Sequence, residues 1–264
     1  MFRGLICFLL LTALSAHCQN AANASPALAG VAAFRSAYQT WDGEQFTRAC
    51  QLLRQATVQA PDNATNFYWL GVAEFHRMLQ LQSSPGQDDE ASSARDAAQK
   101  ALLQALKLDP HQAECHALLG SIYGIRIGEN WLRAIYLGPR AKSQCDDALA
   151  DGPKNPRVRY LLGSGEFYMA SKPAGWRKAL DTFLLAEKFF EAEKTNPPAS
   201  PLEPRWGLSS CRTFIGMTYE KLDERGKAAD YFRKALAEHP ADQRAREGLN
   251  RVAKTQTAEN HHEP

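Results

Sequence analysis

The sequence lacks the features of several broad protein classes. Among its 264 residues, 17 Gly and 14 Pro are an ordinary share, too small for a collagen-like or Pro/Gly low-complexity chain. The 31 basic and 29 acidic residues nearly cancel at a net charge of +2, so the strongly basic surface of a nucleic-acid-binding protein is not expected. Hydrophobic residues make up 44% of the chain, which is enough to bury a core.

Catalytic and cofactor motifs are also missing. The sequence contains no phosphate-binding Gly-rich loop, no His-Glu-x-x-His, no Cys-x-x-Cys and no Gly-x-Ser-x-Gly. One group of possible metal ligands is close together in the sequence: His111, Glu114, Cys115 and His116. Their positions in the repeat favour packing or helix capping over metal binding. We therefore expect no enzyme activity, no cofactor and no metal site.

The N-terminus has the layout of a secretory signal peptide. Arg3 precedes an apolar run over residues 5–14 and small residues follow, and the run is too short to cross a bilayer. Residues 1–18 are the predicted signal peptide, with cleavage after Ser15 or Cys18. A lipid anchor on Cys18 is the less favoured alternative, because His17 stands where a bacterial lipobox has Gly, Ala or Ser. No transmembrane span is expected.

The rest of the chain has helical periodicity and repeats itself. Residues 209–240 carry a spaced set of small and large residues: Ile215, Gly216, Tyr219, Ala228, Phe232, Ala235 and Pro240. Similar sets begin at Leu70-Gly71, Leu119-Gly120 and Leu162-Gly163, and a degenerate unit ends at Pro61. The pattern resembles the tetratricopeptide repeat (TPR) family, and the signal peptide suggests a secreted or periplasmic protein of the bacterial type.

The resemblance implies an all-α, right-handed solenoid of about five helical hairpins with a C-terminal capping helix. In such a fold Gly lets the two helices of a hairpin approach closely, and each hairpin covers the apolar face of the next. We expect a linker at residues 19–29, the repeat domain at 30–256 and a disordered tail at 257–264. The repeated glycines are 49, 43 and 53 residues apart, against the usual 34, so insertions are expected as loops on one face.

The resemblance also implies a concave groove lined by the first helix of each hairpin. Carried onto this sequence, it indicates a groove lined by Tyr68, Val72, Phe75, His76, Ser121, Ile125, Tyr160, Ser164, Phe167, Tyr168 and Met217. These side chains are mainly aromatic and apolar, so the expected ligand is an extended peptide or an amphipathic helix of a partner protein. The alternative is that they pack against neighbouring hairpins or beneath the insertions.

Trp131, Arg133 and Tyr136 in the insertion at 126–140 form either a second contact site or a plug over the core. Cys50, Cys115, Cys145 and Cys211 are expected to be unpaired thiols that face inward. Two further functions stay open. One is a lipid-anchored subunit of an envelope assembly, and the other is a hydrolase that uses Glu166 as a general base, since Ser164 lacks the context of a nucleophile.

Overall fold

The computed structural model describes residues 25–260, with side chains as far as residue 254. The predicted signal peptide and the alternative anchor at Cys18 lie outside this part. The described chain contains eleven α-helices, one 3₁₀ helix and no strand. The helices are α2 Pro26–Thr40, α3 Gly43–Gln59, α4 Ala64–Gln82, α5 Asp88–Leu108, α6 Ala113–Glu129, α7 Ala134–Asp151, α8 Pro156–Met169, α9 Pro173–Lys194, α10 Leu208–Lys221, α11 Arg225–Glu238 and α12 Gln243–Asn260.

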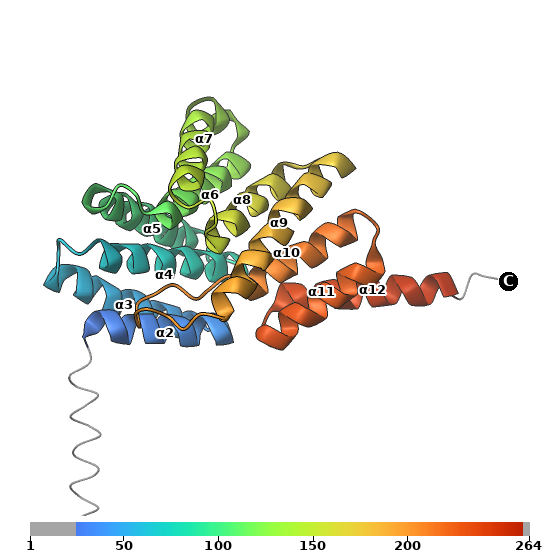
Figure 1. Cartoon of the computed structure of the whole chain (residues 1–264), viewed down its shortest axis with the longest axis horizontal. Coiled ribbons are helices and arrows are strands. Elements are labelled where there is room, and N and C mark those ends of the chain that lie inside the picture. Colours follow the sequence, from blue (N-terminus) through green and yellow to red (C-terminus); the bar gives the residue numbers. More distant parts are fainter. Residues whose placement is uncertain (1–24, 261–264) are drawn as a thin grey trace, which may run out of the picture.

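The helices form five consecutive hairpins, α2/α3 to α10/α11, and α12 packs on the last one (Figure 1). This confirms the expected all-α solenoid. Asp42, Asn63 and Asn155 start their helices by accepting hydrogen bonds from backbone amides of the first turn. The helix α2 begins at Pro26, inside the expected linker, and α12 continues to Asn260, inside the expected tail.

The repeated glycines lie where the two helices of a hairpin touch. A Cβ added at Gly71 would lie 2.6 Å from Leu102, and one at Gly216 would lie 2.7 Å from the ring of Phe232. A larger residue would require the side chain of Leu102 or Phe232 to move. The role that the repeat pattern gave to these glycines is therefore confirmed.

Gly163 gives a matched test of this packing. An added Cβ there would lie 2.8 Å from the Phe183 ring, whereas Gly165, on the same helix, has nothing within 4 Å. We expect Gly163→Ala to destabilise the protein by about 1–3 kcal/mol through overpacking. Gly165→Ala should stabilise it by about 0.5–1 kcal/mol through helix propensity. Urea denaturation of both variants measures this, and equal effects would contradict the close approach.

Most of the inserted residues lengthen helices, which corrects the expectation of loops. In the first insertion α4 runs on to Gln82, and α5 already begins at Asp88, where three acidic residues favour a helix N-terminus. In the second, α6 continues to Glu129 and is followed by the 3₁₀ helix Trp131–Arg133. The long connection is residues 195–207, between α9 and α10.

Candidate protein-interaction surface

The first helices of the hairpins, α4, α6, α8 and α10, carry the predicted groove residues. Six of these residues are buried: Tyr68, Val72, Phe75, His76, Tyr160 and Phe167. Ser121, Ile125, Ser164 and Met217 are partly exposed, and Tyr168 is 65% exposed. The accessible part of the predicted surface is thus its α6–α8–α10 half, and peptide binding there stays a prediction.

Tyr68 and His76 of this surface are covered by the chain's own residues 195–207, here called the covering segment. Figure 1 shows it leaving α9, crossing to the N-terminal hairpins and returning to α10. The indole Nε1 of Trp69 on α4 donates to the carbonyl of Leu202 at 2.8 Å. On α2, Arg35 Nη2 donates to the carbonyls of Pro201 at 2.8 Å and Glu203 at 3.2 Å. The helices therefore hold this segment largely through its backbone.

Trp206, near the end of the covering segment, fills the space between two predicted groove residues. It is 4% exposed, its Nε1 donates to the hydroxyl of Tyr68 at 3.0 Å, and its ring lies 5.0 Å from that of His76. Gly207 follows with a φ of 108°, a left-handed conformation that favours glycine, and the chain then enters α10. The expectation of an open groove at Tyr68 and His76 is therefore corrected: the sequence did not show that a distant insertion would occupy it.

A buried charge network lies beneath Trp206. The Tyr68 hydroxyl donates to Glu114, and Arg157 Nε donates to the same carboxylate at 2.6 Å. Arg157 also donates twice to Glu193, at 2.6 and 2.9 Å. Burial alone would lower the pKa of Arg157, but these carboxylates raise it above its usual value, so the guanidinium stays charged. Sequence reasoning treated Glu114 only as a weak metal candidate and did not identify Arg157.

The other residues considered for chemistry are engaged in structural contacts. The ring nitrogens of His116 lie 2.9 Å from Gln144 Oε1 and from the carbonyl of Pro110. Glu166 forms an ion pair with Lys178 at 2.9 Å and accepts a hydrogen bond from Thr182. Within residues 25–260 no three His, Cys, Asp or Glu side chains are arranged to hold a metal.

The four cysteines of the described chain are free thiols. Cys50, Cys115 and Cys211 are buried. The Sγ of Cys145 lies against Gly120 of the facing helix, 3.0 Å from where a Cβ on Gly120 would be. Burial raises the pKa of each thiol, so they act as small apolar side chains rather than as nucleophiles.

The α6–α7 hairpin ends in an exposed apolar tip. Trp131 is 75% exposed, and Ile135 and Tyr136 are exposed beside it. The helix α7 packs on α6 but has little contact with α8, so it projects from the rest of the solenoid (Figure 1). Arg133 forms an ion pair with Glu129 at 3.2 Å. The plug interpretation is therefore wrong, because a plug would be buried and Trp131 is mostly exposed. A contact role for Trp131, Arg133 and Tyr136 stays a prediction.

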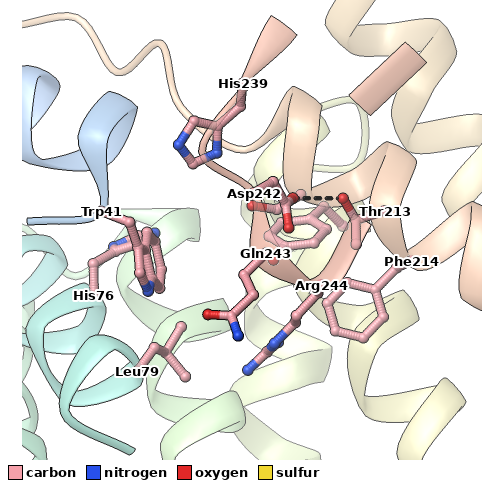
Figure 2. Close-up of a pocket in the computed structure, with 11 residues that line it drawn as sticks. Trp41, His76, Leu79, Thr213, Phe214, His239, Asp242, Gln243 and Arg244 are labelled. Carbon is pink, nitrogen blue, oxygen red and sulfur yellow. Dashed lines mark hydrogen bonds between the residues drawn. The ribbon is translucent and has the colours of Figure 1, made fainter. Parts of the chain in front are cut away.

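The two ends of the solenoid meet. The hydroxyl of Tyr38 on α2 lies 2.8 Å from Ser210 Oγ on α10. The Tyr38 ring stacks on His239, which follows α11, with centroids 5.6 Å apart and an interplanar angle of 13°. A pocket lies at this junction and is called the seam pocket below (Figure 2). Nothing in the repeat pattern indicated this contact, because Tyr38 and His239 are 201 residues apart.

His76 makes the stability of the folded chain depend on pH. Burial lowers its pKa from 6.5 to about 4, although its Nδ1 bonds to the carbonyl of Val72. Between these values the unfolded chain binds a proton that the folded chain does not, so stability falls as the pH falls. We expect the free energy of unfolding to drop by roughly 3 kcal/mol between pH 7 and pH 4 on account of this residue.

This prediction is checked by urea denaturation of wild type and His76→Gln across that pH range. The difference between the two proteins should shrink as the pH falls. His111→Gln is the control, since His111 is an exposed histidine. A difference that stays constant would show that His76 is not buried in its neutral form.

The fold, five consecutive helical hairpins with a further helix packed on the last one, defines a TPR-like α-solenoid protein. The chain belongs to the family described as regulator of microtubule dynamics protein 1-3, whose sequence model matches residues 33–259. Among solved structures it is similar to TTC0263, a thermophilic TPR protein in Thermus thermophilus, with a TM-score of 0.58 and 16% identity. That match covers 85% of this chain and 98% of TTC0263.

A further solved structure is the APC/C hetero-tetramer Cut9–Hcn1, with a TM-score of 0.49 and 15% identity over 84% of this chain and 42% of that one. No curated protein matches the sequence. Within the described residues, none of the helices combines the length and apolar character that crossing a membrane requires.

Proposed function

We propose that this protein is a non-catalytic scaffold that binds a partner protein along its concave face. The covering segment carries this proposal. Arg35 and Trp69 bond to its backbone carbonyls, and aromatic side chains enclose its Trp206. This is how peptide-binding surfaces hold an extended ligand: main-chain bonds supply affinity and pockets supply specificity. A first-helix face that binds one extended segment is suited to binding another beside it.

The proposed partner segment lies on the α6–α8–α10 half of the face, next to the covering segment. Ile125 and Met217 are partly exposed there, and Tyr168 projects beside the rings of Phe167 and Phe214. Aromatic and Met side chains contribute most to interface energies. Because this surface is apolar, the partner should present an extended peptide or the apolar side of an amphipathic helix.

The test is selection of peptides from a displayed random library on the purified protein, followed by measurement of their dissociation constants. Tyr168→Ala combined with Met217→Ala should weaken the selected peptides by about tenfold or more. Met169→Ala is the matched control, because Met169 is exposed at the same helix end but is not a predicted groove residue. Circular dichroism should show unchanged helicity in both. Selection of no peptide, or equal loss with the control, would contradict the proposal.

The absence of catalysis is part of this proposal. Glu166 is the residue that a hydrolase would use, and Lys178 and Thr182 already engage its carboxylate. Profiling with hydrolase-directed probes should therefore give no labelling. Labelling that Glu166→Gln abolishes would favour the enzyme instead.

We also propose that the protein is secreted or periplasmic, with an envelope lipoprotein as the alternative. Both rest on the signal-peptide pattern of residues 1–18. Mass spectrometry of the mature N-terminus tests them: cleavage after Ser15 or Cys18 supports secretion, and a diacylglycerol-modified Cys18 supports the lipid-anchored subunit.

The family description gives a second candidate function, regulation of microtubule dynamics. Co-sedimentation of the purified protein with microtubules tests it, with the Tyr168→Ala and Met217→Ala variant showing whether the same face is used.

A further inference from the structure

The seam pocket lies between the N-terminal hairpins and the start of α12. Trp41, Leu79 and Phe214 give it apolar walls, and Tyr160, His239 and Arg244 give it polar ones. Figure 2 shows Arg244 and Gln243 reaching from α12 toward the side of Trp41, His76 and Leu79. The cavity has a volume of about 70 Å³, which is room for about five water molecules. Gln243 and Arg244 of its lining are exposed to solvent.

Three polar groups of the pocket have no partner among the described residues. His239 is 3% exposed, and its Nε2 is buried without a hydrogen bond. Tyr160 is 9% exposed, and its hydroxyl makes no hydrogen bond within residues 25–260. Arg244 forms no ion pair there, although its charge is close enough to influence the Tyr160 hydroxyl. A buried polar atom such as His239 Nε2 is normally satisfied. Arg244 is exposed and has no ion-pair partner among the described residues, so together with the Tyr160 hydroxyl it is free to bond to a molecule that enters the pocket.

The acidic residue of the lining, Asp242, does not neutralise Arg244 through a direct contact. Its Oδ2 accepts from Thr213 Oγ1 at 2.6 Å, and its Oδ1 accepts from the Ala245 amide at 3.0 Å. Its carboxylate therefore caps α12 and ties the helix to α10. The guanidinium of Arg244 and the hydroxyl of Tyr160 remain as hydrogen-bond donors.

We propose that the seam pocket binds the carboxylate of a small organic acid that carries a short apolar group. Arg244 donates to the carboxylate in the two-pronged geometry that guanidinium groups favour, and Tyr160 donates the further hydrogen bond. Trp41, Leu79 and Phe214 enclose the apolar group. This function goes beyond the proposed binding of a protein on the concave face. A free acid and the C-terminal residue of a polypeptide offer the same chemistry, and the experiment separates them.

Binding is measured by titration calorimetry of the full protein with propionate and with its uncharged analogue propionamide, which match the size of the pocket. A second pair of probes is a tetrapeptide ending in Ala with a free or an amidated C-terminus. Free acids are the source if propionate binds as tightly as the free peptide. A polypeptide C-terminus is the source if the free peptide binds more tightly. In both cases the uncharged probe should bind about tenfold more weakly or worse.

Variants identify the site. Arg244→Gln should weaken acid binding about tenfold or more, and Tyr160→Phe, which keeps the ring, should weaken it about threefold. Asp242→Asn removes a negative charge that repels the carboxylate of the ligand, and should strengthen binding about threefold. Arg48→Gln, an exposed arginine on α3, is the control and should change nothing. Failure of both acids to bind, equal binding of the uncharged probes, or unchanged binding by Arg244→Gln would overturn the proposal.

Discussion

Arg157→Met should destabilise the protein by about 3–5 kcal/mol, because it removes the cation bonded to a buried carboxylate. Among the described residues, Glu114 has Arg157 as its sole ion-pair partner, at 2.6 Å, and both side chains are buried. The loss also breaks two bonds to Glu193. The network joins α6, α8 and α9 beneath Trp206, so this variant tests the packing of the central hairpins.

Urea denaturation of Arg157→Met measures the effect. Arg159→Met is the matched control, since Arg159 bonds to a backbone carbonyl at the surface, and it should cost less than about 1 kcal/mol. Adding Glu114→Gln to Arg157→Met should recover part of the loss, because the unpaired charge is then gone. A loss below about 1 kcal/mol for Arg157→Met would show that Glu114 is not buried as a carboxylate.

Trp206→Ala should cost about 3–5 kcal/mol, as expected for loss of a buried indole. It removes the hydrogen bond to Tyr68 and the ring contact with His76. Since Trp206 fixes the end of the covering segment, hydrogen exchange should rise across residues 196–206.

The control for this variant is Trp131→Ala, which removes a 75% exposed indole and should change stability by less than about 0.5 kcal/mol. Denaturation and hydrogen exchange measured by mass spectrometry check both variants. Equal stability of the two, or unchanged exchange across residues 196–206, would contradict the assigned position of the covering segment.

Local pattern was sufficient to predict the hairpins. The contacts of Gly71 with Leu102 and of Gly216 with Phe232 occur inside one hairpin, so each repeat carries the information for its own packing. Stacking of the hairpins then follows from their exposed apolar faces.

The sequence did not predict what lies on the concave face. Residues 195–207 have no periodicity, and their position depends on Arg35, Trp69 and Tyr68, which lie more than 130 residues away. The seam pocket likewise depends on Tyr38 meeting His239. Such contacts between distant segments carry no local signal, and so the predicted groove was only in part an accessible surface.

Partner binding on the concave face is tested most directly by hydrogen exchange of the protein with and without a selected peptide. Binding along the concave face should give new protection on the first helices α6, α8 and α10, with exchange of their second helices α7, α9 and α11 unchanged. Protection confined to those second helices would place the partner on the outer surface and contradict binding along the concave face.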